Sequence, residues 1–162
     1  ELSIKLHQLR RPPRYRAAYE RETERSASAL FTAIMRIGGR EGWFDANWMW
    51  RLRGAFDRMI FGVGAARGRR SASELRIGDV IDFWRVEDLQ PERRLLLRSE
   101  MRMPGRAWLE FTVEDLGTKR RLGITAHYAT RSVNGRAYWR FFEPFHWYIF
   151  ARLLRQIERR SR

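Results

Sequence analysis

Residues 107–129 read AWLEFTVEDLGTKRRLGITAHYA, in which two alternating runs of apolar and polar residues flank a turn at Gly117. Alternation with a period of two is typical of strands that bury one face. The stretch therefore predicts two antiparallel strands, 107–114 and 120–129. A shared apolar face fixes their register through three pairs: Leu109 with Ala126, Phe111 with Ile124, and Val113 with Leu122.

The period of two begins earlier in the chain, and it predicts two further strands at 80–87 and 94–103. Their turns are marked by Gln90-Pro91 and Pro104-Gly105. Extending the shared apolar face to the strand 94–103 gives an expected register against the strand 107–114: Met103 opposite Ala107, Met101 opposite Leu109, Ser99 opposite Phe111, and Leu97 opposite Val113. Ile81 and Phe83 are expected on the apolar face.

Sequence patterns with a helical period occur both before and after these strands. After a short strand at 18–24, Ser26 or Ser28 can cap a helix with the apolar stripe Leu30, Ile34 and Ile37, which Gly38-Gly39 would end. A second helix is expected over 48–61.

A long aromatic helix follows Asn134-Gly135 and runs to the C-terminus, bent or restarted at Pro144. The simplest packing of these elements is an α+β helix-grip fold: a curved antiparallel sheet wrapped around the C-terminal helix, with two short helices after the first strand. We expect residues 1–18 to form a basic arm or linker and residues 19–162 to form one domain.

The other face of the sheet is polar in this register. The expected rows are Arg102, Trp108 and His127; Glu100, Glu110 and Thr125; and Arg98, Thr112 and Gly123. Asp82 and Trp84 are expected to join this face. Glu100 opposite Glu110, near His127, could be an acid/base site with one raised pKa. The alternative is a salt-bridged, solvated or domain-contacting face, in which Arg98 and Arg102 would neutralise the two carboxylates.

The formal net charge is +14, and the only lysines are Lys5 and Lys119. Such a charge suits nucleic acid or an anionic membrane, but the arginines are spread along the chain as on a solvated surface. The chain has no cysteine, which excludes disulfides and thiolate sites. Its three histidines show no metal-binding spacing, and no signal peptide is visible, so a cytoplasmic protein without a metal is expected.

Four blocks of sequence resemble a bacterial domain family of unknown function in the SRPBCC (START/birch-pollen-allergen-like) superfamily. They are GGREGWFDANWMWRLRGAFDRM (38–59), LRIGDVIDFWRVE (75–87), EMRMPGRAWLEF (100–111) and PFHWYIF (144–150), and the resemblance covers residues 19–155. It implies an apolar cavity between the sheet and the long helix. It also implies a parent protein in which an NmrA-like or epimerase-like Rossmann domain binds NAD(P). Residues 1–18 carry no such fingerprint, so no cofactor is expected in this chain.

Two main hypotheses for function follow. The first is a module that binds an apolar small molecule between sheet and helix, with ten expected contacts: Phe83, Leu97, Met101, Leu109, Phe111, Ile124, Tyr128, Tyr138, Phe142 and Phe145. The second is a catalytic or substrate-shaping domain of an oxidoreductase, with Glu100, Glu110 and His127 as candidates beside a polar cluster: Trp84, Arg98, Arg102, Trp108 and Thr125. Electrostatic binding to nucleic acid or anionic membrane is a third.

Overall fold

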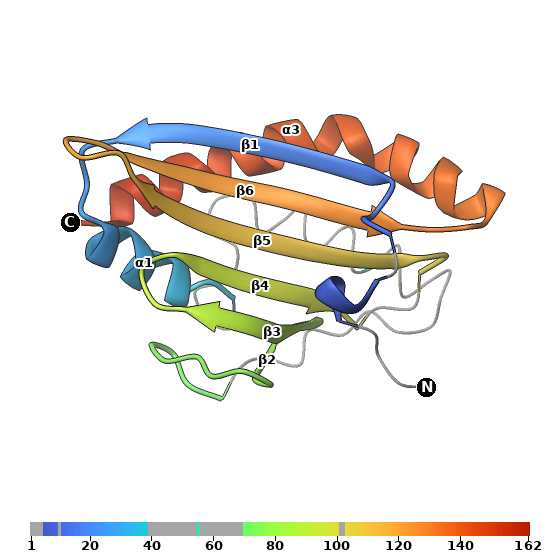
Figure 1. The fold of residues 1–162 in the computed structure, drawn as a ribbon, viewed down its shortest axis with the longest axis horizontal. Helices are drawn as coiled ribbons and strands as arrows, with labels where there is room; N and C mark the ends of the chain where they lie inside the picture. Colours follow the sequence, from blue (N-terminus) through green and yellow to red (C-terminus); the bar gives the residue numbers. More distant parts are fainter. Residues whose placement is uncertain (1–4, 10, 39–54, 56–69, 101–102) are drawn as a thin grey trace.

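A curved antiparallel sheet of six strands forms the framework of the protein in the computed structural model (Figure 1). The structure describes residues 5–9, 11–38, 55, 70–100 and 103–162. The strands are β1 (Tyr15–Thr23), β2 (Val80–Ile81), β3 (Trp84–Gln90), β4 (Arg94–Ser99), β5 (Arg106–Asp115) and β6 (Arg120–Ala129). They lie in the order β1-β6-β5-β4-β3-β2, so β1 pairs with the last strand of the chain.

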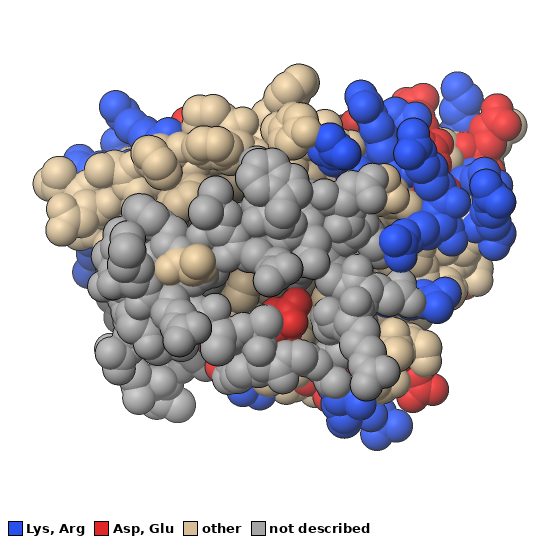
Figure 2. All heavy atoms as spheres, turned by 180° about the vertical axis from the view of Figure 1, so that it is seen from behind, with Lys and Arg blue, Asp and Glu red and all other residues tan. Residues whose placement is uncertain are grey.

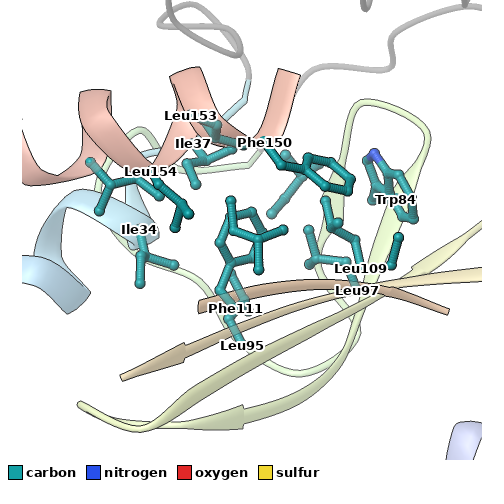
Figure 3. Packing of buried hydrophobic residues seen from close by; sticks show 14 of the residues in the cluster. Ile34, Ile37, Trp84, Leu95, Leu97, Leu109, Phe111, Phe150, Leu153 and Leu154 are labelled. Carbon is teal, nitrogen blue, oxygen red and sulfur yellow. The ribbon is translucent and has the colours of Figure 1, made fainter. Parts of the chain in front are cut away.

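Two helices, α1 (Ala27–Met35) and α3 (Val133–Arg160), cover the same face of the sheet, with the core between them and the strands (Figure 3). We call this the inner face and the opposite one the outer face. Leu95, Leu97, Leu109 and Phe111 point from the strands toward the helices, and each is at most 1% exposed. This arrangement confirms the predicted α+β helix-grip fold.

The register of β5 against β6 is the predicted one, with Leu109 opposite Ala126 and Phe111 opposite Ile124. The predicted register of β4 against β5 is wrong. Leu97 lies opposite Leu109 instead of Val113, a displacement of four residues. Because four is an even number, the apolar residues keep their face. The strand β4 ends at Ser99 and β5 begins at Arg106, so the two strands are further apart in the sequence than the predicted turn at Pro104-Gly105 requires.

The strand predicted over 80–87 is a hairpin instead. β2 ends at Ile81, and β3 begins at Trp84, directly opposite it. Asp82 occupies the turn with a φ of 54°, in the left-handed region that Asp tolerates better than most residues. The hairpin places Trp84 on the inner face beside Leu97 and Leu109 (Figure 3), whereas the sequence predicted it on the polar face.

Helix α1 begins where Ser26 accepts a hydrogen bond from the Ala29 N–H at 3.1 Å, so Ser26 rather than Ser28 is the cap. Its stripe is buried as predicted, and Leu30, Ile34 and Ile37 are all 0% exposed. Gly38 follows with a φ of +82°, and a Cβ atom there would lie 2.1 Å from the Ile81 Cγ2. Only glycine fits this close approach. The helix predicted over 48–61 lies outside the described residues, Ala55 excepted.

Part of the expected N-terminal arm belongs to the sheet. β1 begins at Tyr15, and Tyr15, Ala17 and Tyr19 pack against the core from the inner face. A turn of 3-10 helix, η1 (Leu6–Gln8), lies over the outer face of the sheet (Figure 1). There the Leu6 N–H donates a hydrogen bond of 3.0 Å to the Glu87 carboxylate. At least residues 15–18 are therefore not a linker.

Helix α3 begins at its Ser132 cap, which accepts a hydrogen bond from the Gly135 N–H at 2.9 Å. It continues through Pro144 instead of restarting there, and Pro144 lies on the exposed side. Within the described part of the chain, we find no helix of sufficient length and hydrophobicity to span a membrane.

Candidate functional site

A small cavity lies between the sheet and the first half of α3. Its volume is about 20 Å³, room for about one water molecule. Leu109, Ala126 and Tyr128 form part of its wall on the strands, and Tyr138 and Trp139 part of its wall on α3. At this volume it does not confirm the ligand cavity that the family resemblance implies between sheet and long helix, because it is too small for an organic ligand in this conformation.

Stacked aromatic rings surround the cavity. The Tyr128 and Trp139 ring centroids are 5.7 Å apart with an interplanar angle of 10°. The Tyr138 and Phe142 centroids are 4.7 Å apart. His146 stacks on Phe150 at 5.3 Å, so its ring belongs to the same aromatic layer. Aromatic walls of this kind suit flat, apolar molecules.

The structure divides the ten predicted ligand contacts into four groups. Leu109, Tyr128, Tyr138 and Phe142 line the cavity. Phe83, Leu97, Phe111 and Ile124 are buried in the core but do not reach it. Phe145 is 44% exposed and points away from the core, contrary to the prediction. Met101 lies outside the described residues.

Further described residues of the cavity wall were missing from that prediction: Trp84, Ala107, Trp108, Ala126, His127, Trp139, His146 and Phe150. Ala107 and Ala126 are small residues at inward positions between large ones, a pattern that can indicate space in a core. Trp84 was missed because the turn at Asp82 was read as strand. His146 is 4% exposed, as expected for a core histidine.

Glu87 carries a buried carboxylate on the outer face. The β3–β4 pairing is irregular between Val86 and Asp88, and this bulge sets the direction of the intervening Glu87. The Glu87 side chain is 1% exposed and lies 3.3 Å from the Arg98 Nη1. The Trp108 indole N–H donates to the same carboxylate oxygen at 3.3 Å. With the Leu6 N–H on the second oxygen, the arrangement stabilises a charge that would otherwise be costly to bury.

Glu110 and His127 form a second polar group on the outer face. The His127 Nε2 lies 3.3 Å from the Glu110 Oε1, and the Arg94 Nε lies 2.5 Å from the Oε2. The hydrogen bond from His127, joined by Arg94, holds the pKa of Glu110 below its ordinary value, although burial acts against this. Glu110 is thus a carboxylate at neutral pH, and a general acid with a raised pKa is not found here.

The predicted Glu100–Glu110 pair does not form, because the shifted register places Leu96 opposite Glu110. Glu100 instead forms an ion pair with Arg85. Arg98 lies opposite Trp108, the position predicted for Arg102, which itself lies outside the described residues. Thr125 lies opposite Glu110, as predicted. The geometry fits the interpretation of a salt-bridged outer face better than that of an acid/base pair.

Metal binding finds no support in this part of the molecule. Among residues 5–9, 11–38, 55, 70–100 and 103–162, no three histidine or carboxylate side chains lie close enough together to hold an ion. The Glu110–His127 pair has Arg94 as its third member, and a guanidinium cannot be a ligand.

The curved antiparallel sheet and the long C-terminal helix define a protein of the helix-grip class. Residues 10–153 match the model of the family described as "Protein of unknown function (DUF2867)", and the chain belongs to that family. A search of curated proteins gave no match.

Solved structures share the fold at low sequence identity. Protein MLL2253 from Mesorhizobium loti superposes with a TM-score of 0.53 and 13% identity, over 91% of this chain and 99% of that one. The Zhui aromatase/cyclase from Streptomyces sp. R1128 gives a TM-score of 0.53 and 15% identity, over 91% and 96% of the two chains. These likenesses define the architecture and leave function to be argued from the site.

Proposed function

We propose that the chain binds an apolar, aromatic small molecule between the sheet and the first half of α3. The observation that carries the proposal is the cavity itself, which lies at the sheet–helix interface inside a layer of stacked aromatic rings. The shared fold of an aromatase/cyclase is compatible with this role. Because the cavity holds about one water molecule, binding requires that α3 move away from the sheet.

The anchoring of α3 supports such a movement. In the first half of the helix, residues 133–146, the buried residues are Gly135, Trp139, Phe142 and His146, of which only Trp139 and Phe142 carry apolar side chains. In the second half, residues 147–160, all of the buried residues carry apolar side chains: Ile149, Phe150, Leu153, Leu154 and Ile157. A segment with fewer buried apolar contacts opens at lower free energy. We therefore infer that the first half of α3 moves while the second half keeps the helix attached.

The test compares a substitution that fills the cavity with a control substitution at an exposed position. Ala126→Leu adds a branched side chain to the cavity wall, whereas Ala18→Leu adds the same atoms on β1, where Ala18 is exposed. We expect 1-anilinonaphthalene-8-sulfonate to bind the wild type saturably, with about five-fold weaker binding to Ala126→Leu and unchanged binding to Ala18→Leu, since an overpacked site excludes the dye.

Equal binding by the two variants would place the dye elsewhere and contradict the proposal. So would a wild type that shows no saturable fluorescence increase. Circular dichroism melts of both variants show whether each remains folded at the temperature of the titration. A role beside an NAD(P)-binding Rossmann domain in a longer protein stays a separate proposal.

A further inference from the structure

The outward side of α3 carries a stripe with two chemically different halves. Phe141, Phe145 and Tyr148 form its aromatic half, and Arg152, Arg155 and Arg159 form its basic half. The spacing along the stripe alternates between four and three residues, which keeps all six on one side of a helix. The opposite side of α3 faces the core through residues such as His146, Ile149 and Leu153.

The aromatic half is exposed to an unusual degree. Phe141 is 60% exposed, Phe145 44% and Tyr148 40%, and the adjacent Trp147 is 63% exposed. Seen from the helix side, the surface along α3 is largely uncharged over its first half and rich in Lys and Arg toward its C-terminal end (Figure 2). An open groove of about 390 Å³ runs along residues 147–159 of α3. Exposed aromatic clusters of this kind mark interaction sites.

The stripe is complementary to itself in the antiparallel direction. Reversing the helix about position 150 places Phe141 opposite Arg159, Phe145 opposite Arg155 and Tyr148 opposite Arg152. Each aromatic ring then meets a guanidinium, and the two basic halves lie at opposite ends and do not face each other. Within one helix this contact already exists, since the Arg152 guanidinium lies 5.3 Å from the centre of the Tyr148 ring.

We propose that this stripe binds a second copy of the chain, with the two α3 helices antiparallel about a two-fold axis near position 150. The complementarity of rings and guanidinium groups favours a second copy of the chain as the partner, because a polyanion would contact only the basic half of the stripe. The flank of the stripe is also suited to close approach, because the small Ala151 lies beside it near the axis and leaves room there. This inference does not depend on ligand binding in the cavity.

A net charge of +14 on each copy opposes the association. Added salt screens that repulsion, so the dimer should become stronger with ionic strength. Binding of the same arginines to an anionic membrane or to nucleic acid weakens with salt. The sign of the salt dependence thus separates the proposed partner from the alternatives.

Sedimentation equilibrium of the wild type provides the first test. We expect the weight-average mass to rise from 19.5 kDa toward twice that value with protein concentration, and to rise further when sodium chloride is added. A mass that stays at 19.5 kDa at every concentration and salt would overturn the proposal.

Two substitutions at one exposed position provide a sharper test, since both remove the same ring. Phe145→Arg sets a cation against Arg155 of the other copy and should abolish the dimer, whereas Phe145→Glu sets an anion there and should retain it. Adding Arg155→Glu to Phe145→Arg should restore association. If Phe145→Arg and Phe145→Glu associate equally well, the register is wrong. Tighter binding of Phe145→Arg than wild type to phosphatidylcholine/phosphatidylglycerol vesicles, without a wild-type dimer, would assign the face to a membrane.

Cross-linking tests the axis directly, because the chain has no cysteine of its own. An equimolar mixture of Tyr148→Cys and Arg152→Cys chains should give a disulfide-linked dimer under mild oxidation, because the proposed register places these two positions opposite each other. Val133→Cys is the control, since Val133 is 68% exposed on the same helix but lies outside the stripe. Cross-linking of Val133→Cys chains to the same extent would indicate random collision and contradict the proposed axis.

Discussion

The Trp108 indole N–H and the Glu87 carboxylate are joined at 3.3 Å on the outer face of the sheet, and both side chains are almost fully buried there. Arg98 and the Leu6 N–H contact the same carboxylate. This group links three strands, β3, β4 and β5, to η1, which precedes the sheet in the chain. We interpret it as a structural lock that holds the N-terminal segment against the outer face.

Replacing the carboxylate tests this lock. Glu87→Gln leaves Arg98 without its buried counter-charge, so we expect the free energy of unfolding to fall by about 3 to 5 kcal/mol in urea titrations. Hydrogen exchange at the Leu6 amide should accelerate as well. The control is Glu22→Gln, whose partner Lys119 is 3.9 Å away at the surface, and we expect it to change stability by less than about 1 kcal/mol. An unchanged Leu6 exchange rate would contradict the lock.

The pKa of Glu110 predicts a pH dependence with a definite sign. His127 and Arg94 hold the folded-state pKa below the ordinary value of 4.5. The stability that Glu110 contributes is therefore complete above 4.5 and is lost as the pH falls through the folded-state pKa. Glu110→Gln should lower the free energy of unfolding by about 1 to 3 kcal/mol at neutral pH.

Urea titrations at a series of pH values check this expectation. The difference between wild type and Glu110→Gln should shrink as the pH is lowered from 4.5. Glu114→Gln is the matched control, because Glu114 contacts Arg121 but is 59% exposed, and its effect should stay under about 1 kcal/mol. A difference for Glu110→Gln that grows in acid would show that the sign is wrong.

Alanine substitutions at Gly38 and Gly117 distinguish the energetic cost of backbone strain from that of steric crowding. Both have a positive φ, +82° and +93°, but a Cβ atom would strike the Ile81 side chain only at Gly38, and Gly117 has open space around it. We expect Gly117→Ala to cost about 1 kcal/mol and Gly38→Ala about 2 to 4 kcal/mol in unfolding free energy. Equal costs for the two variants would mean that α1 does not approach β2 as closely as described.

The two serines before and within α1 provide a fourth prediction. Ser26 accepts the Ala29 N–H at 3.1 Å, whereas Ser28 lies inside the helix and is exposed. Ser26→Ala should therefore lower the free energy of unfolding by about 1 kcal/mol, and Ser28→Ala should be close to neutral because alanine favours helix. Thermal melts compare the two variants, and a larger loss for Ser28→Ala would contradict the cap assignment.

The fold could be predicted from the sequence where local patterns are unambiguous. Strong alternation on both sides of the Gly117 turn determined the β5–β6 register, and every predicted pair is present. The β4–β5 register could not be obtained in this way, because alternation specifies a face but not the number of residues between the two strands. This error placed Glu100 opposite Glu110 in the prediction, whereas Leu96 lies there in the structure.

The candidate site was harder to predict than the fold. Trp84 was assigned to the wrong face because one turn at Asp82 reverses the chain inside an apparently continuous strand. Glu87 was missed because a bulge, which the alternation does not reveal, sets the direction of its side chain. The exposure of Phe145 could be read from the helical period of α3, in which it shares a side with Arg152.

Native mass spectrometry of gently purified protein tests the central proposal, ligand binding beneath α3, most directly. We predict that the wild type carries a small-molecule adduct above its 19.5 kDa mass, that Ala18→Leu retains it, and that Ala126→Leu loses it. An adduct that both variants retain equally, or a wild type that shows only the 19.5 kDa chain and takes up no added 1-anilinonaphthalene-8-sulfonate, would contradict the proposal.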